Sequence, residues 1–107
     1  MTETAYVQVM TTTDQEQEAA SLAETLLQAR LAACVQVLGP MTSRYWWQGE
    51  LEKATEYLLI IKTRADLLDQ LVETLRENHS YDVPEITATS IVGGNPAYLK
   101  WVGAQTR

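Results

Sequence analysis

The sequence predicts a mixed α/β fold of the α+β kind, in which two helices pack on one sheet. Strand-like and helix-like patterns alternate along a chain of 107 residues, a length that suits one compact domain spanning residues 1–107. In two segments, apolar side chains recur every three or four residues, which is the spacing of one helix face. The segments between them are rich in branched and aromatic residues, as strands are.

The first half of the chain begins with a strand, a helix and a second strand. Residues 6–10 alternate with the period of a strand, and residues 11–14 offer hydroxyls and a carboxylate that can cap a helix. The first helix is expected over residues 14–30 and the second strand over residues 34–38, with a break at Gly39-Pro40. The helix stripe consists of Ala19, Leu22, Ala23, Leu26 and Leu27.

An aromatic hairpin and a second set of elements follow. Residues 42–48 resume an extended pattern, with a turn at Gly49-Glu50, and residues 57–61 form the third strand. Residues 63–66 match the capping signature of a second helix, whose stripe is Leu67, Leu68, Leu71, Val72 and Leu75. A fourth strand is expected over residues 86–92, ended by Gly93-Gly94. Asn95-Pro96 then starts a short terminal helix with apolar Tyr98, Leu99, Trp101 and Val102.

This order of elements closes most simply as a ferredoxin-like βαββαβ sandwich with an inserted hairpin and a short C-terminal helix. Both long helices then cover the same face of the sheet. Leu58 and Ile60 alternate with Leu59 and Ile61, so the third strand is apolar on both faces. One short helix cannot cover the second face of a four-stranded sheet, and the sequence therefore predicts a homo-oligomer.

Composition excludes several classes of partner. The formal charge is −6, from 14 acidic and 8 basic residues, and no basic run is present, so nucleic acid and anionic membranes are not expected partners. No apolar run is long enough to cross a bilayer, and the N-terminus lacks a basic region followed by an apolar one. The single cysteine, Cys34, agrees with a reducing compartment. A cytoplasmic location is expected.

Residues 79–86 concentrate the specific chemistry of the chain, because they hold its one histidine, a tyrosine, a proline and a carboxylate. Pro84 keeps the backbone extended, so Tyr81 and Glu85 are presented from a restrained segment that suits a site or a subunit contact. His79 either interacts with the carbonyls of a helix end, acts as a ligand, or takes part in proton transfer. Glu85 either ligates a cation, accepts a proton, or pairs with Lys62 or Arg44 at a subunit junction.

Other candidate residues also have two interpretations. Cys34 is favoured as a small buried hydrophobe over a redox or copper-binding residue. Lys62 aims its ammonium at a carboxylate or at an anionic ligand. The aromatic side chains of Tyr45, Trp46 and Trp47 pack in an interface or stack on a flat ligand.

Five segments, in order along the chain, resemble the CutA divalent-cation tolerance family. They are Leu31-Ala32-Ala33-Cys34-Val35, Ser43-Arg44-Tyr45-Trp46-Trp47-Gln48-Gly49, Ile61-Lys62-Thr63, His79-Ser80-Tyr81-Asp82-Val83-Pro84-Glu85-Ile86 and Asn95-Pro96-Ala97-Tyr98-Leu99-Lys100-Trp101. The resemblance implies a ferredoxin-like subunit in a tight homotrimer, related in architecture to the PII signalling proteins. In such trimers the long strands extend into neighbouring subunits, which would supply the cover missing from the second face.

The same resemblance implies a protein that binds or responds to copper and similar metal ions, without a required cofactor. The candidate metal ligands are His79, Glu85 and Met10. Copper-binding relatives can offer a cysteine where Met10 stands, and some carry two adjacent histidines where this chain has Asn78-His79. Thioether and imidazole suit copper, so binding is expected to be weaker and not absent.

The alternative is a PII-like module for a ligand or partner protein. Its intersubunit clefts, lined by Tyr45, Trp47, Lys62, His79 and Tyr81, would receive a small anion or another protein. An enzyme is not expected, because the sequence shows neither a nucleophile beside a base nor two carboxylates in distinct environments.

Overall fold

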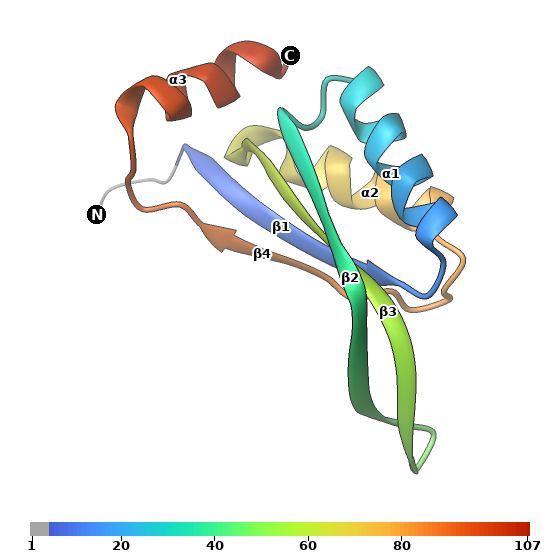
Figure 1. Cartoon of the computed structure of the whole chain (residues 1–107). Helices are drawn as coiled ribbons and strands as arrows, with labels where there is room; N and C mark the ends of the chain where they lie inside the picture. Colours follow the sequence, from blue (N-terminus) through green and yellow to red (C-terminus); the bar gives the residue numbers. More distant parts are fainter. Residues whose placement is uncertain (1–4) are drawn as a thin grey trace.

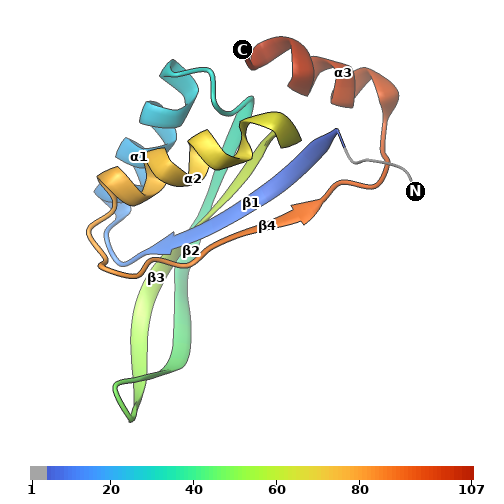
Figure 2. The same cartoon turned by 180° about the vertical axis from the view of Figure 1, so that it is seen from behind.

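The computed structural model describes residues 5–107 as a four-stranded antiparallel sheet with two helices on one face and a third at one end (Figures 1 and 2). The strand order is β2-β3-β1-β4, which confirms the expected ferredoxin-like sandwich. The elements are β1 (Tyr6–Thr13), α1 (Glu16–Gln28), β2 (Cys34–Trp47), β3 (Glu50–Arg64), the 3-10 turn η1 (Ala65–Leu67), α2 (Leu68–Asn78), β4 (Ile86–Ser90) and α3 (Pro96–Gln105).

The core lies between the sheet and the helices α1 and α2. Leu59 and Ile61 of β3 are fully buried there, together with Val9 of the paired strand β1. The helices contribute their predicted stripes, of which Leu22, Leu26, Leu71 and Leu75 are buried. Removing this apolar surface from water is the main source of stability.

Strands β2 and β3 form one long hairpin that extends away from the body of the molecule (Figure 1). The hairpin expected beyond Gly39-Pro40 is present as the outer part of β2 and β3, but the expected strand break at Gly39-Pro40 is wrong. Strand β2 continues past Pro40, because an irregularity in pairing between Leu38 and Met41 absorbs a residue that cannot donate. Gly39 adopts a φ of +152°, and an added Cβ would lie 2.6 Å from the ring of Tyr57. The turn is formed at Gln48-Gly49, and β3 already begins at Glu50.

The expected side-chain caps of the two long helices are also wrong. Thr13 and Thr63 remain in strands β1 and β3, where they pair with Tyr57 and Val7, and neither long helix has a side-chain cap hydrogen bond. The Thr63 hydroxyl instead donates to the Leu31 carbonyl at 2.6 Å. The cap of the terminal helix is as expected, because the Ala97 amide donates to Asn95 Oδ1 at 3.1 Å.

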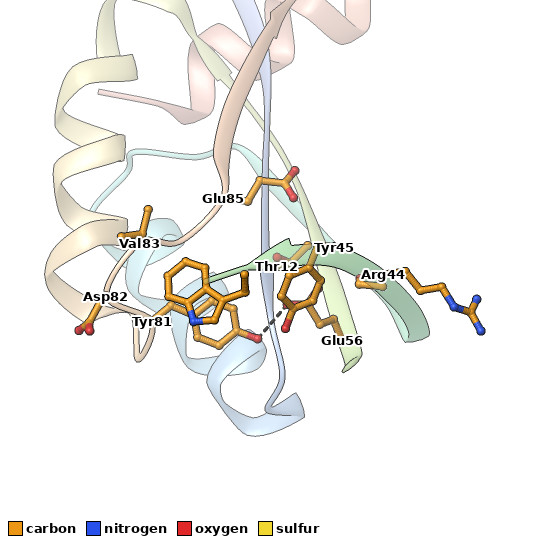
Figure 3. Close-up of a pocket in the computed structure, with 10 residues that line it drawn as sticks. Thr12, Arg44, Tyr45, Glu56, Tyr81, Asp82, Val83 and Glu85 are labelled. Carbon is orange, nitrogen blue, oxygen red and sulfur yellow. Dashed lines mark hydrogen bonds between the residues drawn. The ribbon is translucent and has the colours of Figure 1, made fainter. Parts of the chain in front are cut away.

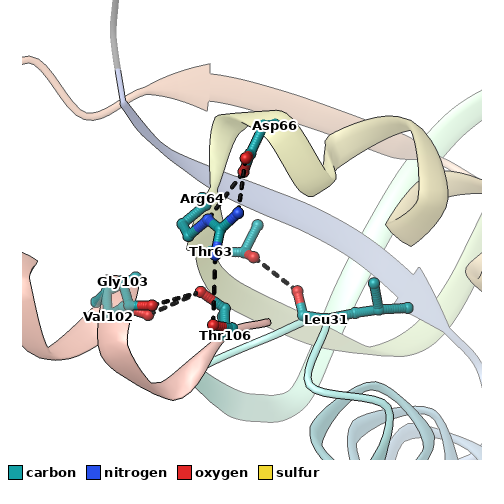
Figure 4. Close-up of polar contacts among 7 residues, drawn as sticks. All are labelled: Leu31, Thr63, Arg64, Asp66, Val102, Gly103 and Thr106. Atoms are coloured by element: carbon teal, nitrogen blue, oxygen red, sulfur yellow. Dashed lines mark hydrogen bonds and ion pairs between the residues drawn. The ribbon is translucent and has the colours of Figure 1, made fainter.

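Helix α3 is fastened to one end of the sheet by the contacts in Figure 4. Arg64 donates to both oxygens of Asp66 and, at 3.4 Å, to the Thr106 carbonyl. Val102 is fully buried, and a Cβ on Gly103 would lie 3.1 Å from the Tyr6 hydroxyl. The rest of the second face stays open: Leu58 and Ile60 are partly exposed, and Leu38 is 50% exposed.

Replacement of Leu59 by alanine should lower the free energy of unfolding by about 2 to 5 kcal/mol, because it empties a fully buried site under both helices. Leu51→Ala, on the same strand but 63% exposed, should change it by no more than about 0.5 kcal/mol. Chemical denaturation monitored by circular dichroism compares the two variants. Equal effects would contradict the assignment of the core to the helix-covered face.

Candidate functional site

A cleft of about 600 Å³ opens where the long hairpin leaves the body of the molecule (Figure 3). Its walls come from the end of β1, the middle of the β2–β3 hairpin and the segment between α2 and β4. The lining residues are Thr12, Ser43, Arg44, Tyr45, Trp47, Glu56, Tyr81, Asp82, Val83 and Glu85. This volume lies within the range of small-molecule sites in proteins.

A buried carboxylate and a tyrosine form the floor of the cleft. Glu56 is only 6% exposed, and its Oε2 atom accepts a hydrogen bond from the Tyr81 hydroxyl at 2.8 Å (Figure 3). A buried carboxylate is costly unless a donor compensates for lost hydration, and Tyr81 supplies that donor. Burial, followed by this hydrogen bond and the negative charge of Glu56, raises the pKa of Tyr81 well above its ordinary value.

His79, which lies beneath the floor of the cleft, fixes the position of Tyr81 through a hydrogen bond. The His79 side chain is fully buried, and its Nδ1 atom accepts from the Tyr81 amide at 3.1 Å. Since Nδ1 is an acceptor, the ring proton lies on Nε2, which donates to the Thr12 carbonyl at 2.8 Å. Both ring nitrogens are therefore occupied, and neither presents a free lone pair to a metal.

Glu18 of α1 ties the same segment to the helical layer. One of its carboxylate oxygens accepts from the Ser80 amide at 2.9 Å and lies 3.5 Å from His79 Nδ1. Burial by itself would raise the pKa of Glu18, but the hydrogen bonds from Ser80 and the nearby His79 outweigh it and lower that pKa. The segment that carries Tyr81 is thus fixed by contacts to both α1 and β1.

The cleft gathers three of the five residues predicted to line it, and His79 lies buried beneath it. Tyr45, Trp47 and Tyr81 are there, whereas Lys62 lies further along β3 and donates to the Gln36 side chain. Glu56 was missed from the sequence: by alternation along β3 it lies on the side of Leu58 and Ile60, and the sequence does not show that Tyr81 contacts it there.

The predicted metal ligands are not brought together in one chain. Met10 pairs with Ile60 and Thr87 within the sheet, Glu85 lines the cleft, and His79 is buried beneath it. Among residues 5–107, no group of three or more His, Cys, Asp or Glu side chains could hold a metal ion. The ion pairs of this part of the chain join Arg64 to Asp66 and Arg76 to Glu73, while Glu18 lies beside His79. Within the described part of one chain, Glu85 pairs with neither Lys62 nor Arg44, so its pairing at a subunit junction stays a prediction.

Cys34 is the first residue of β2 and is only partly buried. Burial and the proximity of Cys34 raise the pKa of Tyr98 on α3. Within the described residues, no helix is both long enough and apolar enough to span a membrane.

Comparisons with known proteins identify one family. The family described as "CutA1 divalent ion tolerance protein" matches residues 7–105. The divalent-cation tolerance protein CutA of Thermus thermophilus is 41% identical over 98 residues, which cover 92% of this chain and 95% of the relative. The crystal structure of CutA1 from Oryza sativa superposes with a TM-score of 0.94 at 42% identity, covering 97% of this chain and 95% of that chain.

Other relatives are considerably longer than this chain. The chloroplastic protein CutA 1 of Oryza sativa subsp. japonica is 49% identical over 86 residues, which cover 80% of this chain but 49% of the relative. The chloroplastic CutA of Arabidopsis thaliana is 46% identical over 80% of this chain and 47% of its own length. The chain thus spans about half the length of these two relatives.

Raising the pH above about 10 should destabilise the fold, in part through Tyr81. The unfolded tyrosine loses its proton near pH 10, whereas burial and Glu56 keep Tyr81 protonated in the folded state. The stabilisation is complete below pH 10 and is lost as the pH rises further. The free energy of unfolding should therefore fall less steeply above pH 10 in Tyr81→Phe than in the parent, as measured by denaturation at a series of pH values. Parallel slopes in the two proteins would contradict this role.

Proposed function

This chain belongs to the CutA1 divalent ion tolerance protein family, and on that premise we propose that it acts in tolerance of copper and similar divalent cations as a homotrimer that binds or responds to them. The match to the family over residues 7–105 is the observation that carries the proposal. The role is non-enzymatic. His79, the only histidine, is hydrogen-bonded to Thr12 and Tyr81 and is therefore not free to act as a general base.

The open second face of the sheet supports an oligomer. Leu58 and Ile60 are only partly buried by the described residues, and Leu38, which pairs with Leu58, is 50% exposed. Exposed apolar side chains gathered on one sheet face commonly mark a protein–protein interface. The projecting hairpin gives one copy the reach to cover the exposed apolar surface of another.

Metal binding is proposed at junctions between copies, because one chain does not assemble a ligand set. Met10 and Glu85 sit on the sheet surface and at the cleft, where a neighbouring copy can add ligands. His79 would have to give up one of its two hydrogen bonds in order to join them. Thioether sulfur favours Cu(I), and imidazole favours Cu(II).

Two further parts of the proposal rest on the sequence. The chain is proposed to fold as one domain, supported by the single cluster of buried side chains that α1, α2 and the sheet share. A cytoplasmic location is proposed from the use of one cysteine. The names of relatives differ on location: two are called chloroplastic and one, from Archaeoglobus fulgidus, periplasmic.

A PII-like module remains the second candidate function, favoured by the cleft itself. Tyr45, Trp47 and Tyr81 line a cavity that is large enough for a small molecule or a partner's side chain. Lys62 lies outside this cavity and donates to the Gln36 side chain, so an anion site that includes Lys62 is proposed only between copies of the chain. Loss of a partner on Trp47→Ala, in a protein that remains trimeric, would favour this function.

Sedimentation with and without copper tests the main proposal, with bound metal per chain recorded in the same samples. The expected result is a trimer under both conditions and saturable binding that falls several-fold in Glu85→Ala. Glu77→Ala, an exposed position on α2, is the matched control and should retain the metal. His79→Ala should lose metal as well, but it also removes two buried hydrogen bonds, so its fold is checked by circular dichroism. A trimer that ignores copper would contradict direct binding.

Truncation of Ile60 tests the oligomer separately from the metal. If a neighbouring copy covers the second face, Ile60→Ala should cost about 2 to 5 kcal/mol per subunit and shift dissociation to higher protein concentration. Sedimentation over a dilution series measures the shift. A monomeric mass for the parent at micromolar concentration, or a near-neutral effect of Ile60→Ala, would contradict the trimer.

A further inference from the structure

We propose that the cleft within each subunit is a binding site for a small organic ammonium ion. The proposal goes beyond the tolerance function and does not depend on copper. Three kinds of observation support it: the aromatic lining, the sign of the charge, and the rigidity of the floor.

The aromatic lining provides faces that attract a cation. Tyr45, Trp47 and Tyr81 all line the cavity, and they come from two segments far apart in the sequence. Tyr45 and Trp47 are 42% and 47% exposed, so their rings are accessible to a ligand. An alkylammonium ion combines a positive charge with an apolar surface, and aromatic side chains bind such ions through the negative faces of their rings.

The charge of the cleft has the sign that an organic cation requires. Glu56, Asp82 and Glu85 line it, against one cation, Arg44. In Figure 3 the Arg44 side chain extends away from the labelled tyrosines, and the Asp82 carboxylate also points away from them. The negative charge near the rings therefore comes from Glu56 and Glu85, and a small anion would be repelled.

The same carboxylates do not suit a divalent metal within one chain. They form no group of three that could hold an ion, and Glu56 already shares its Oε2 atom with the Tyr81 hydroxyl. Hard cations need several oxygen ligands at about 2.0 to 2.6 Å. A cavity of about 600 Å³ is also far larger than a metal ion and matches an organic molecule.

The floor of the site is held in position before any ligand binds. Tyr81 is fixed at its hydroxyl by Glu56 and at its amide by His79, and the adjacent Ser80 amide is fixed by Glu18. A site that is already ordered loses little conformational entropy on binding. The raised pKa of Tyr81 keeps its hydroxyl a donor to Glu56, so one carboxylate oxygen stays directed at the ring.

Titration with tetramethylammonium chloride, followed by NMR of the tryptophan indole N–H signals, tests this site in the full-length protein. Sodium chloride keeps ionic strength constant, and tert-butanol serves as a neutral probe of similar shape. Of the three tryptophans, Trp47 should shift saturably, while Trp46 and Trp101, which lie outside the cleft, should not. The neutral probe should bind at least about tenfold more weakly.

Matched variants separate ring and charge effects. Tyr45→Ala and Glu85→Gln should each weaken ammonium binding by about tenfold. Trp46→Ala and Glu77→Gln, one neighbouring ring and one distant carboxylate, should leave it unchanged. Absence of saturable shifts in the parent overturns the proposal, as does equal weakening by the controls or tighter binding of phosphate. Because metal content and sedimentation are not the readouts, its failure is distinguishable from failure of the tolerance function.

Discussion

Strand β3 is the element on which the rest of this structure depends, because it pairs along its length with β2 and also with β1. Its alternation places Leu59 and Ile61 under the helices and Leu58 and Ile60 on the opposite face. The helices α1 and α2 cover only Leu59 and Ile61. A strand that is apolar on both sides therefore fixes the core of the subunit and also leaves the surface that an oligomer would bury.

His79 connects this sheet to the cleft. Its ring bonds the Thr12 carbonyl near the end of β1 and the Tyr81 amide, and Tyr81 in turn bonds Glu56 on β3. Three segments distant in sequence are thus joined through buried polar groups, which are favourable only when each has its partner. Residues 79–86 are rich in polar side chains but form no metal site within one chain. The polar groups of His79, Ser80 and Tyr81 instead make hydrogen bonds that fix the segment in position.

Much of the fold could be predicted from sequence, because it depends on periodicity. The stripe containing Leu71 and Leu75 indicates a buried helix face, and Asn95 does cap α3. The failures have local causes. Gly39-Pro40 has the composition of a strand break, but pairing with β3 on both sides carries β2 through it. Thr63 has the spacing of a helix cap, but its hydroxyl bonds the Leu31 carbonyl, a tertiary contact that spacing cannot reveal. For the cleft, the aromatic residues were identifiable, whereas Glu56 required knowledge of which side of β3 meets Tyr81.

The distribution of charge constrains what each part of the sheet can bind. Lys62 and Gln36 lie toward the start of β2, while Glu56 and Glu85 lie beside the long hairpin. An overall charge of −6 gives a weak attraction for cations. Glu56 and Glu85 concentrate part of this negative charge at the cleft. Yet the candidate metal ligands within one chain are either occupied, as in His79, or located apart, as in Met10 and Glu85. The proposed binding of divalent cations is therefore assigned to assembled copies, whereas the proposed ammonium site lies within each subunit.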